Sequence, residues 1–336
     1  MNKREIIKNI LSGNKGDYVP WSIALTQEAR DKIITAFGDV DIVEWLDNHI
    51  IQFGNRIGFY KDIGDDRVAD IFGAVWDRSI DKDIGVVENL VLPQATLKGY
   101  EFPDPLAEQF FQDIKIQCDK YPDRFRAFDI GFSLYERAWI LRGMTNLMMD
   151  FFDNPLFVHE LFNAIADYNI AQIHQAVEYD IDAVYFGDDW GQQQGLQIKP
   201  QHWFEFVYPA LKRMYTEVKK AGKFIIIHSC GKVDELFDDL IDIGVNCFNP
   251  FQPEVIDVKS ALAKYRTRLT FFGGLSTQKI LPFGNEEQVR KATRELLEWG
   301  KTGGLIFSPA HAVEGDVPIE NIAAMLDELK KQPGYC

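Results

Sequence analysis

Cysteine is scarce in this chain, and its four residues, Cys118, Cys230, Cys247 and Cys336, stand at irregular positions. That scatter excludes a small disulfide-stapled scaffold and suits a reducing compartment. Basic residues are also in deficit, with 36 Lys and Arg against 51 Asp and Glu and a formal net charge of -15. No basic stripe is present, which argues against a nucleic-acid partner because phosphate backbones attract clustered positive charge.

Long apolar runs are missing as well. No stretch approaches the roughly 18 uninterrupted apolar residues of a membrane-spanning helix, so no membrane partner is expected. The first residues, MNKREIIKNILSGNKGD, are too polar for a signal peptide. Together with the cysteine pattern, these absences predict a cytoplasmic protein.

What the chain does contain is a rhythm of short apolar runs separated by helical patterns. Continuous apolar runs are typical of parallel strands that are covered on both faces. The runs are 182–189, 223–230, 245–250, 268–275 and 304–311, and the helix-like segments between and beside them are 201–222, 232–244, 257–266 and 286–303.

The first half of the chain is less regular. Further strands are expected at 19–26 and 126–134, with a less clear one near 48–53. Alternating strands and helices favour either a doubly wound sheet or a (β/α)8 TIM barrel, and the strand count and chain length favour the barrel. We therefore expect a single domain over 1–336, interrupted by an excursion of hairpins at 54–105 that forms a lid or wall beside the site.

The run FIIIHSCG places His228 and Cys230 at a strand end, where barrels carry their catalytic groups. Alternate residues on an extended chain point the same way, so a His-x-Cys pair offers two zinc ligands from one segment. His311, at the end of the last strand, is a candidate third ligand, and three ligands leave the open position of a catalytic zinc. From spacing alone, the alternative is a hydrogen-bonded histidine beside a small buried cysteine.

Asp188 and Asp189 end another apolar run. Adjacent residues on a strand point to opposite faces, so we expect one carboxylate to reach a substrate or metal. The other is then expected to cap a loop or helix. The GQQQG that follows, residues 191–195, is either a source of amide hydrogen bonds to a ligand or a plain polar loop.

Several motifs in the same order resemble the uroporphyrinogen decarboxylase superfamily. The resemblance covers residues 180–330 and extends more loosely over the whole chain, and it implies a single (β/α) barrel. The motifs are GDDWGQQQGLQIKPQHWFEFVYPALKRM, HSCGKVDELFDDLIDIGVNCFNPFQP, LTFFGGLSTQ and FSPAHAVEGDVPIENI.

This superfamily contains two chemistries. Its decarboxylases resemble one another in an RQAGRY-like segment whose arginines hold the carboxylates of a porphyrinogen, and the corresponding stretch here, residues 21–33, lacks that arginine pair. Its cobalamin-dependent methyltransferases resemble this chain in HSCG and in a ligand near the end of the last strand. In the coenzyme M enzymes that ligand is a Cys in a PGC-like turn, and here His311 stands in SPAHA.

The resemblance therefore implies a zinc-dependent methyltransferase that moves a methyl group between a small methylated substrate, such as a methoxyaromatic compound, and a corrinoid (cobalamin) protein. A zinc site with two histidines and one cysteine is a stronger Lewis acid than one with two cysteines, which suits it to polarising an ether oxygen. Alternatives are decarboxylation of a tetrapyrrole and a non-catalytic barrel that binds a small ligand, and a homodimer is one option for assembly. The implied roles are Zn²⁺ binding by His228, Cys230 and His311, coordination or substrate orientation by Asp188 or Asp189, and pocket lining by Tyr185, Trp190, Gln193 and Asn249.

Overall fold

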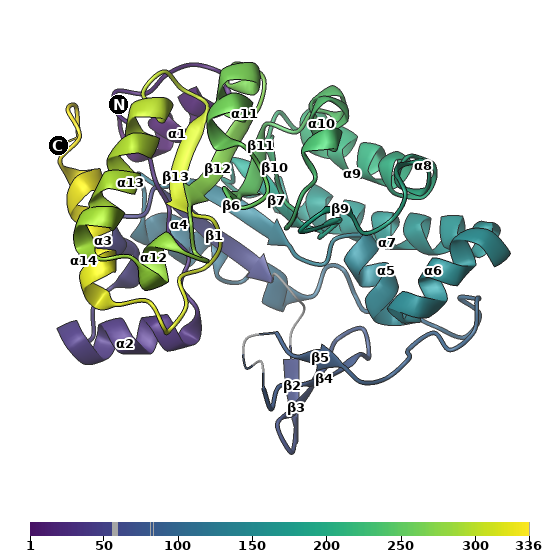
Figure 1. The fold of residues 1–336 in the computed structure, drawn as a ribbon. Helices are drawn as coiled ribbons and strands as arrows, with labels where there is room; N and C mark the ends of the chain where they lie inside the picture. The colour runs from purple at the N-terminus through teal and green to yellow at the C-terminus, as the bar shows by residue number, and fades with distance from the viewer. Residues whose placement is uncertain (56–59, 81, 83, 336) are drawn as a thin grey trace.

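A parallel sheet of seven strands forms the centre of the computed structural model, which describes residues 1–55, 60–80, 82 and 84–335. Every apolar run predicted between residues 182 and 311 overlaps one of these strands, and so do the segments near 48–53 and 126–134. In sheet order they are β1 (Ile50–Asn55), β6 (Phe125–Ile130), β7 (Ala183–Gly187), β10 (Phe224–His228), β11 (Cys247–Phe251), β12 (Thr270–Leu275) and β13 (Leu305–Pro309) (Figure 1).

The segment predicted as a strand at 19–26 closes this sheet into a barrel. Phe307 of β13 donates its N–H to the Pro20 carbonyl and accepts from the Ser22 N–H, while His49, just before β1, donates to the Trp21 carbonyl. The ladder stays irregular because Pro20 has no N–H and the Ile23 N–H binds the Asn48 side chain instead. The predicted (β/α)8 barrel is thus confirmed. Its eighth strand position is taken by the segment at 19–26, which pairs through isolated β-bridges.

Helices wrap the outside of the barrel between successive strands (Figure 1). The predicted helix at 201–222 is divided into α8, a π-helical turn η2 (Trp203–Val207) and α9, and single 3₁₀ turns occur at η1 (Glu108–Phe110) and η3 (Asp234–Leu236). The α-helices are α1 (Lys3–Leu11), α2 (Gln27–Phe37), α3 (Ile42–Leu46), α4 (Ile114–Lys120), α5 (Tyr135–Arg142), α6 (Met144–Asp153), α7 (Pro155–Ala176), α8 (Pro200–His202), α9 (Tyr208–Lys220), α10 (Phe237–Ile243), α11 (Val258–Tyr265), α12 (Ile280–Phe283), α13 (Glu286–Gly300) and α14 (Ile319–Lys330).

Each strand divides its residues between two cores. Outward residues such as Phe186, Ile227 and Phe248 belong to the large core shared with the helices. Inward residues form a smaller cluster with the apolar side of α1, which closes the amino-terminal end of the barrel. Two residues further along β7, β10, β11 and β13 the inward positions become more polar, so functional groups collect at the carboxyl end. The inward apolar residues include Ala183, Ile226, Cys247 and Ile306, and the positions that follow them are Tyr185, His228, Asn249 and Ser308.

The excursion predicted at 54–105 contains a small antiparallel sheet that projects from the barrel (Figure 1). Part of the excursion, residues 56–59, 81 and 83, lies outside the described residues. The expected hairpins are present as β2 (Tyr60–Gly64), β3 (Arg67–Asp70), β4 (Val75–Asp77) and β5 (Val86–Val87).

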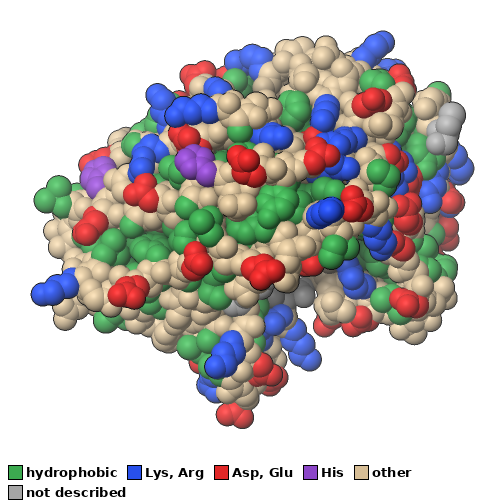
Figure 2. Space-filling view, turned by 180° about the vertical axis from the view of Figure 1, so that it is seen from behind, with side chains coloured by type: hydrophobic (Ala, Val, Ile, Leu, Met, Phe, Trp, Pro, Cys, Tyr) green, Lys and Arg blue, Asp and Glu red, His purple; other side chains and the backbone are tan. Residues whose placement is uncertain are grey.

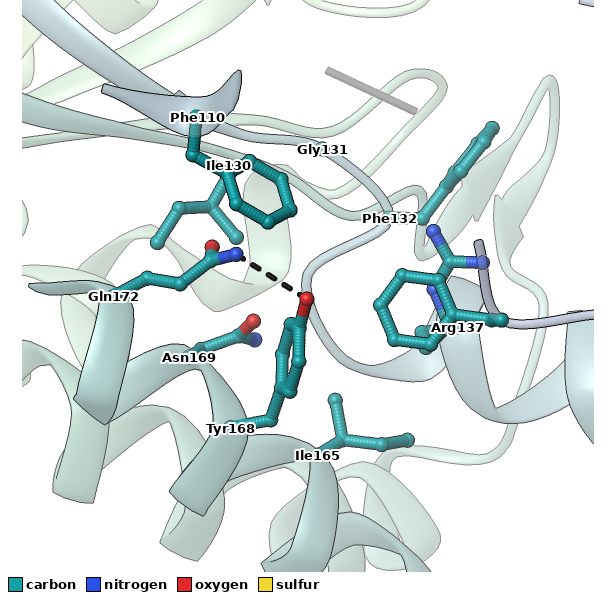
Figure 3. Close-up of a pocket in the computed structure, with 10 residues that line it drawn as sticks. Phe110, Ile130, Gly131, Phe132, Arg137, Ile165, Tyr168, Asn169 and Gln172 are labelled. Atoms are coloured by element: carbon teal, nitrogen blue, oxygen red, sulfur yellow. Dashed lines mark hydrogen bonds between the residues drawn. The ribbon is translucent and has the colours of Figure 1, made fainter. Parts of the chain in front are cut away.

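A buried ion pair fastens this small sheet to the barrel. Arg137 of α5 donates to Asp70 Oδ2 at 3.0 Å, and both side chains are almost fully buried. The Arg137 guanidinium also lies 3.8 Å from the centroid of the Phe72 ring. Trp76 stacks on Phe132 at 5.5 Å between ring centroids. Figure 3 shows Arg137 and Phe132 beside a cavity of about 20 Å³, which has room for about one water molecule.

Acidic and basic side chains are mixed on the molecular surface. On the face in Figure 2, Lys and Arg lie among Asp and Glu rather than in a continuous track. A phosphate backbone would therefore meet no extended positive stripe there. Within the described ranges, no helix combines the length and the apolar character needed to span a bilayer.

Replacing Arg137 by Met is expected to lower the free energy of unfolding by about 3–5 kcal/mol, because it leaves the Asp70 carboxylate buried without its cation. Chemical denaturation measures the loss. The matched control is Arg67→Met, which breaks the more exposed pair between Arg67 of the same sheet and Glu88 and should cost far less, because water screens it. Equal, small losses in both variants would contradict the anchoring role of Arg137.

Candidate metal centre

His228, Cys230 and His311 come together at the carboxyl end of the barrel. His228 ends β10, Cys230 follows two residues later, and His311 lies two residues beyond β13. One ligand atom from each residue lies within 4.8 Å of the other two. Cys230 Sγ is 3.3 Å from His228 Nε2, and the two imidazole rings are 6.0 Å apart between centroids. The three side chains singled out in the sequence are thus neighbours in space.

Their donor atoms suit zinc. Zinc–nitrogen distances near 2.1 Å and zinc–sulfur distances near 2.3 Å put adjacent tetrahedral donors roughly 3.5 Å apart. The separation of His228 Nε2 and Cys230 Sγ is close to that value, and the exposed His311 has room to turn toward them. Imidazole and thiolate are preferred zinc ligands, and three of them leave a fourth position for water or substrate.

Hydrogen bonds from the neighbouring loops fix the chain through Cys230. The Cys230 N–H donates to Asp189 Oδ1 at 2.7 Å, and the Ser229 N–H donates to the Asn249 carbonyl at 2.7 Å. The Ser229 hydroxyl oxygen in turn accepts from the Trp190 N–H at 2.9 Å. The loop after β7 and strand β11 therefore hold the thiol beside His228.

Gly231 allows these loops to meet. Its φ of +87° lies in the left-handed region that favours glycine. A Cβ on Gly231 would lie 2.5 Å from the backbone of Gly191 and Gln192, and a Cβ on Gly191 would lie 2.6 Å from the Cys230 carbonyl oxygen. The glycines of HSCG and of GQQQG thus share one close backbone contact. The Gly231 N–H donates to Gln252 Oε1 at 2.7 Å.

The second ring nitrogen of His228, Nδ1, also has a hydrogen-bond partner. Asn249 Oδ1 lies 2.6 Å from His228 Nδ1 and accepts a hydrogen bond of 2.6 Å from the Tyr185 hydroxyl. Asn249 and Tyr185 are each 8% exposed. Both were expected to line a substrate pocket, and both also contact the histidine that would bind the metal.

Of Asp188 and Asp189, Asp188 is the one that caps a helix. Its carboxylate is fully buried and accepts from the backbone N–H groups of Leu134, Tyr135 and Glu136 at the start of α5. The Trp190 indole donates to it as well, at 2.5 Å. Burial raises the pKa of Asp188 to about 6, although these donors act in the opposite direction. Of the two aspartates, one of which was expected to cap a loop or helix, Asp188 is thus the one that caps α5.

Asp189 is the aspartate whose side chain lies beside the candidate metal ligands. Its Oδ1 lies 3.8 Å from His228 Nε2 and accepts from the Cys230 N–H. Trp190 is fully buried against Trp203, and Gln193 is exposed in the turn between β8 (Gly191–Gln192) and β9 (Gly195–Leu196). Neither Trp190 nor Gln193 is among the described residues that line the barrel pocket, where both were expected.

Acidic neighbours shape the electrostatics around Cys230. Burial, followed by the negative charges of Asp189 and Glu136, raises the pKa of the Cys230 thiol. Burial and the charges of Asp189 and Asp188 raise the pKa of Glu136 well above its ordinary range. A bound cation would reverse this balance and favour the thiolate. Glu136 was not foreseen, because its place beside the site depends on how α5 packs.

A pocket of about 490 Å³ opens inside the barrel mouth next to His228 and His311. Its polar lining was predictable from strand alternation. Gln52 on β1 and Asp129 on β6 stand at inward-pointing positions, as Tyr185 does on β7. Among the described residues that line it, Arg30 is the single Lys or Arg. The excursion expected as a lid or wall contributes Gly54 to this lining, and no described residue of the small sheet takes part. The lining at the strand ends includes Gln52, Asp129, Tyr185, Asn249, Phe272 and Ser308.

Relatedness to known proteins agrees with this architecture. The family model described as uroporphyrinogen decarboxylase (URO-D) matches residues 85–332. The chain belongs to the uroporphyrinogen decarboxylase family. The URO-D match includes β6 to β13 together with His228, Cys230 and His311.

Relatives in the URO-D superfamily carry both of its chemistries in their names. Uroporphyrinogen decarboxylase of Methylococcus capsulatus is 22% identical over 68% of this chain and 66% of its own length. Methylated-thiol–coenzyme M methyltransferase of Methanosarcina mazei is 24% identical over 57% of this chain and 50% of its own length. The chain thus spans about half to two thirds of the length of the curated relatives it matches.

A solved structure supports the fold along nearly the whole chain. A methyltransferase from Methanosarcina mazei matches with a TM-score of 0.79 and 16% identity, covering 98% of this chain and 99% of that protein. At this identity, the match establishes the URO-D barrel as the shared fold.

Gly231→Ala is expected to lower the free energy of unfolding by roughly 2–5 kcal/mol and to weaken zinc binding, because the new Cβ adds left-handed strain and a backbone clash. The matched control is Gly222→Ala, where φ is +67° but nothing lies within 4 Å of the added Cβ. It should cost about 1–2 kcal/mol from strain alone and leave zinc binding unchanged. Thermal denaturation and zinc titration measure the two effects, and indistinguishable variants would refute the close contact.

Proposed function

We propose that this protein is a zinc-dependent methyltransferase that moves a methyl group between a small methylated substrate, such as a methoxyaromatic compound, and a corrinoid protein. The observation that carries this proposal is the convergence of His228, Cys230 and His311 beside an open pocket in the barrel mouth. A URO-D relative named as a methyltransferase and a structural neighbour with the same description support it.

The ligands determine which chemistry fits. Zinc bound by two neutral imidazoles and one thiolate would act as a Lewis acid that stabilises the alkoxide or phenolate leaving group of a methyl ether. Asp189, near His228 Nε2, would complete the coordination or orient the substrate. Tyr185, Asn249 and the apolar ring of Phe272 line the pocket that would hold a methoxyaromatic molecule.

The reaction also requires partners. A corrinoid carried by a second protein would exchange the methyl group at the barrel mouth. The mouth is the side on which His311 is exposed, so a docked partner can approach the proposed zinc from there. A cytoplasmic location and assembly as a homodimer belong to the same proposal.

Decarboxylation of a tetrapyrrole is the second candidate, favoured by relatives named uroporphyrinogen decarboxylase. It requires arginines that bind several carboxylates and needs no metal. Arg30 is the single such residue in the described pocket lining, which weighs against this reading. A barrel that binds a small ligand without turnover is the third candidate, and metal analysis separates both from the proposed methyltransferase.

Protein purified without chelators is expected to contain about one zinc ion per chain. Cys230→Ser and His311→Ala should each weaken zinc binding at least roughly 100-fold, since even second-shell partners contribute 10–100-fold. The control is Cys118→Ser, because the Cys118 thiol lies against the Asp180 carbonyl, away from the three proposed ligands, and its loss should leave zinc binding unchanged. Elemental analysis and competitive titration provide the measurements, and an absence of zinc in all samples counts against the proposal.

Methyl transfer is the direct assay. The intact protein, mixed with a reduced corrinoid protein and methoxylated aromatic compounds, is expected to methylate the corrinoid, which changes its visible absorption spectrum. Cys230→Ser should abolish this change, and Cys118→Ser should preserve it. Turnover of a porphyrinogen by zinc-free protein would instead support the decarboxylase reading.

A further inference from the structure

Asn249 lies at the centre of a buried hydrogen-bond network that joins four neighbouring strands. Its side-chain Nδ2 donates to the Phe272 carbonyl of β12 at 2.9 Å. Its Oδ1 lies 2.6 Å from both His228 Nδ1 of β10 and the Tyr185 hydroxyl of β7. Asn249 itself belongs to β11. Both polar atoms of the Asn249 amide therefore have hydrogen-bond partners, and these partners belong to different strands.

The Phe272 carbonyl decides which way this amide faces. A backbone carbonyl only accepts hydrogen bonds, so the NH₂ end of Asn249 must point to Phe272. The oxygen end must then face His228 and Tyr185. Because the amide sits between partners of opposite kind, a flipped side chain would place two acceptors against each other at Phe272.

The orientation of Asn249 sets the proton on His228. An amide oxygen only accepts, so a contact of 2.6 Å requires the hydrogen on His228 Nδ1. The lone pair of the neutral ring is then on Nε2, the atom 3.3 Å from Cys230 Sγ. Which ring nitrogen binds a metal is set by the hydrogen bond that the other one makes.

The Tyr185 hydroxyl supports the same arrangement. It is 3.5 Å from His228 Nδ1 but 2.6 Å from Asn249 Oδ1, so the amide oxygen is the nearer acceptor for its proton. Tyr185 thereby holds Asn249 Oδ1 in place. Both side chains are almost completely buried, and both border the pocket in the barrel mouth.

We propose that Asn249 is a positioning residue that keeps His228 in the Nδ1–H tautomer and presents Nε2 to the metal, with Tyr185 bracing the amide. This inference rests on the proposed zinc centre and gives Asn249 and Tyr185 a role beyond lining the pocket. It identifies the chain of contacts from Phe272 to Asn249 to His228 as the outer support of the metal centre.

The test reads the tautomer directly. Long-range ¹H–¹⁵N correlation spectra of the full-length protein, freed of metal, distinguish Nδ1–H from Nε2–H for each of the six histidines, and the His228 signals are assigned by their loss in His228→Gln. The wild-type protein is expected to show the Nδ1–H pattern at His228. An Nε2–H pattern there overturns the proposal before any variant is made.

Variants then separate positioning from packing. Asn249→Leu should lose the single Nδ1–H pattern and weaken zinc binding about 10–100-fold. Asn249→Asp keeps an oxygen acceptor beside His228 Nδ1 but turns its second oxygen toward the Phe272 carbonyl, so it should keep the Nδ1–H tautomer and bind zinc more tightly than Asn249→Leu. The matched control is Asn246→Leu, which removes another amide-to-backbone bond, to the Ile225 N–H, and should leave the His228 tautomer unchanged.

The outcomes distinguish this inference from the proposed function. An unchanged tautomer in Asn249→Leu, or equal loss in Asn249→Leu and Asn246→Leu, overturns the positioning role even if zinc and methyl transfer are found. A tautomer that follows Asn249 as described, with tight zinc binding but no methyl transfer, upholds the positioning role and removes the proposed function alone.

Discussion

Side-chain alternation along a closed parallel barrel is the constraint on which the rest of this structure depends. Each strand sends one set of residues outward to the helices and the other set into the barrel. On β10 the inner set changes from Ile226 to His228, and on β11 from Cys247 to Asn249. Since α1 fills the amino-terminal end with apolar side chains, the polar inner groups gather at the carboxyl end, where the pocket opens.

The strands alone do not complete the metal centre. Cys230 lies beyond β10, where the period of two no longer applies, and its position depends on contacts with the loop after β7. Asp189 and Gly191 supply those contacts, and Asn249 supplies the contact on the far side of His228. The motifs HSCG and GDDWG therefore act as one structural unit, although the helical segment from α8 to α9 and the strands β9 and β10 separate them in the chain.

Much of the fold was predictable because the strands of the second half are continuous apolar runs with short links. The position of the segment at 19–26 was predictable, but its incomplete hydrogen-bond ladder was not. Pro20 and the Asn48 side chain interrupt that ladder. In the site, the sequence predicted that one of Asp188 and Asp189 caps a loop or helix and the other faces the site. It did not predict which aspartate takes which role. Strand alternation ends at Gly187, and the N-terminus of α5, which binds Asp188, is far away in the sequence.

The sequence by itself determined the chemical identity of the donors, their order, and their placement at strand ends of a URO-D barrel. Only the tertiary structure decided that they meet. In the sheet order, β10 and β13 are separated by β11 and β12, and in a flat sheet this spacing would put their ends roughly 14 Å apart. Closure curls the sheet until the ligand atoms of His228, Cys230 and His311 lie within 4.8 Å of one another, because a barrel mouth brings non-adjacent strands face to face.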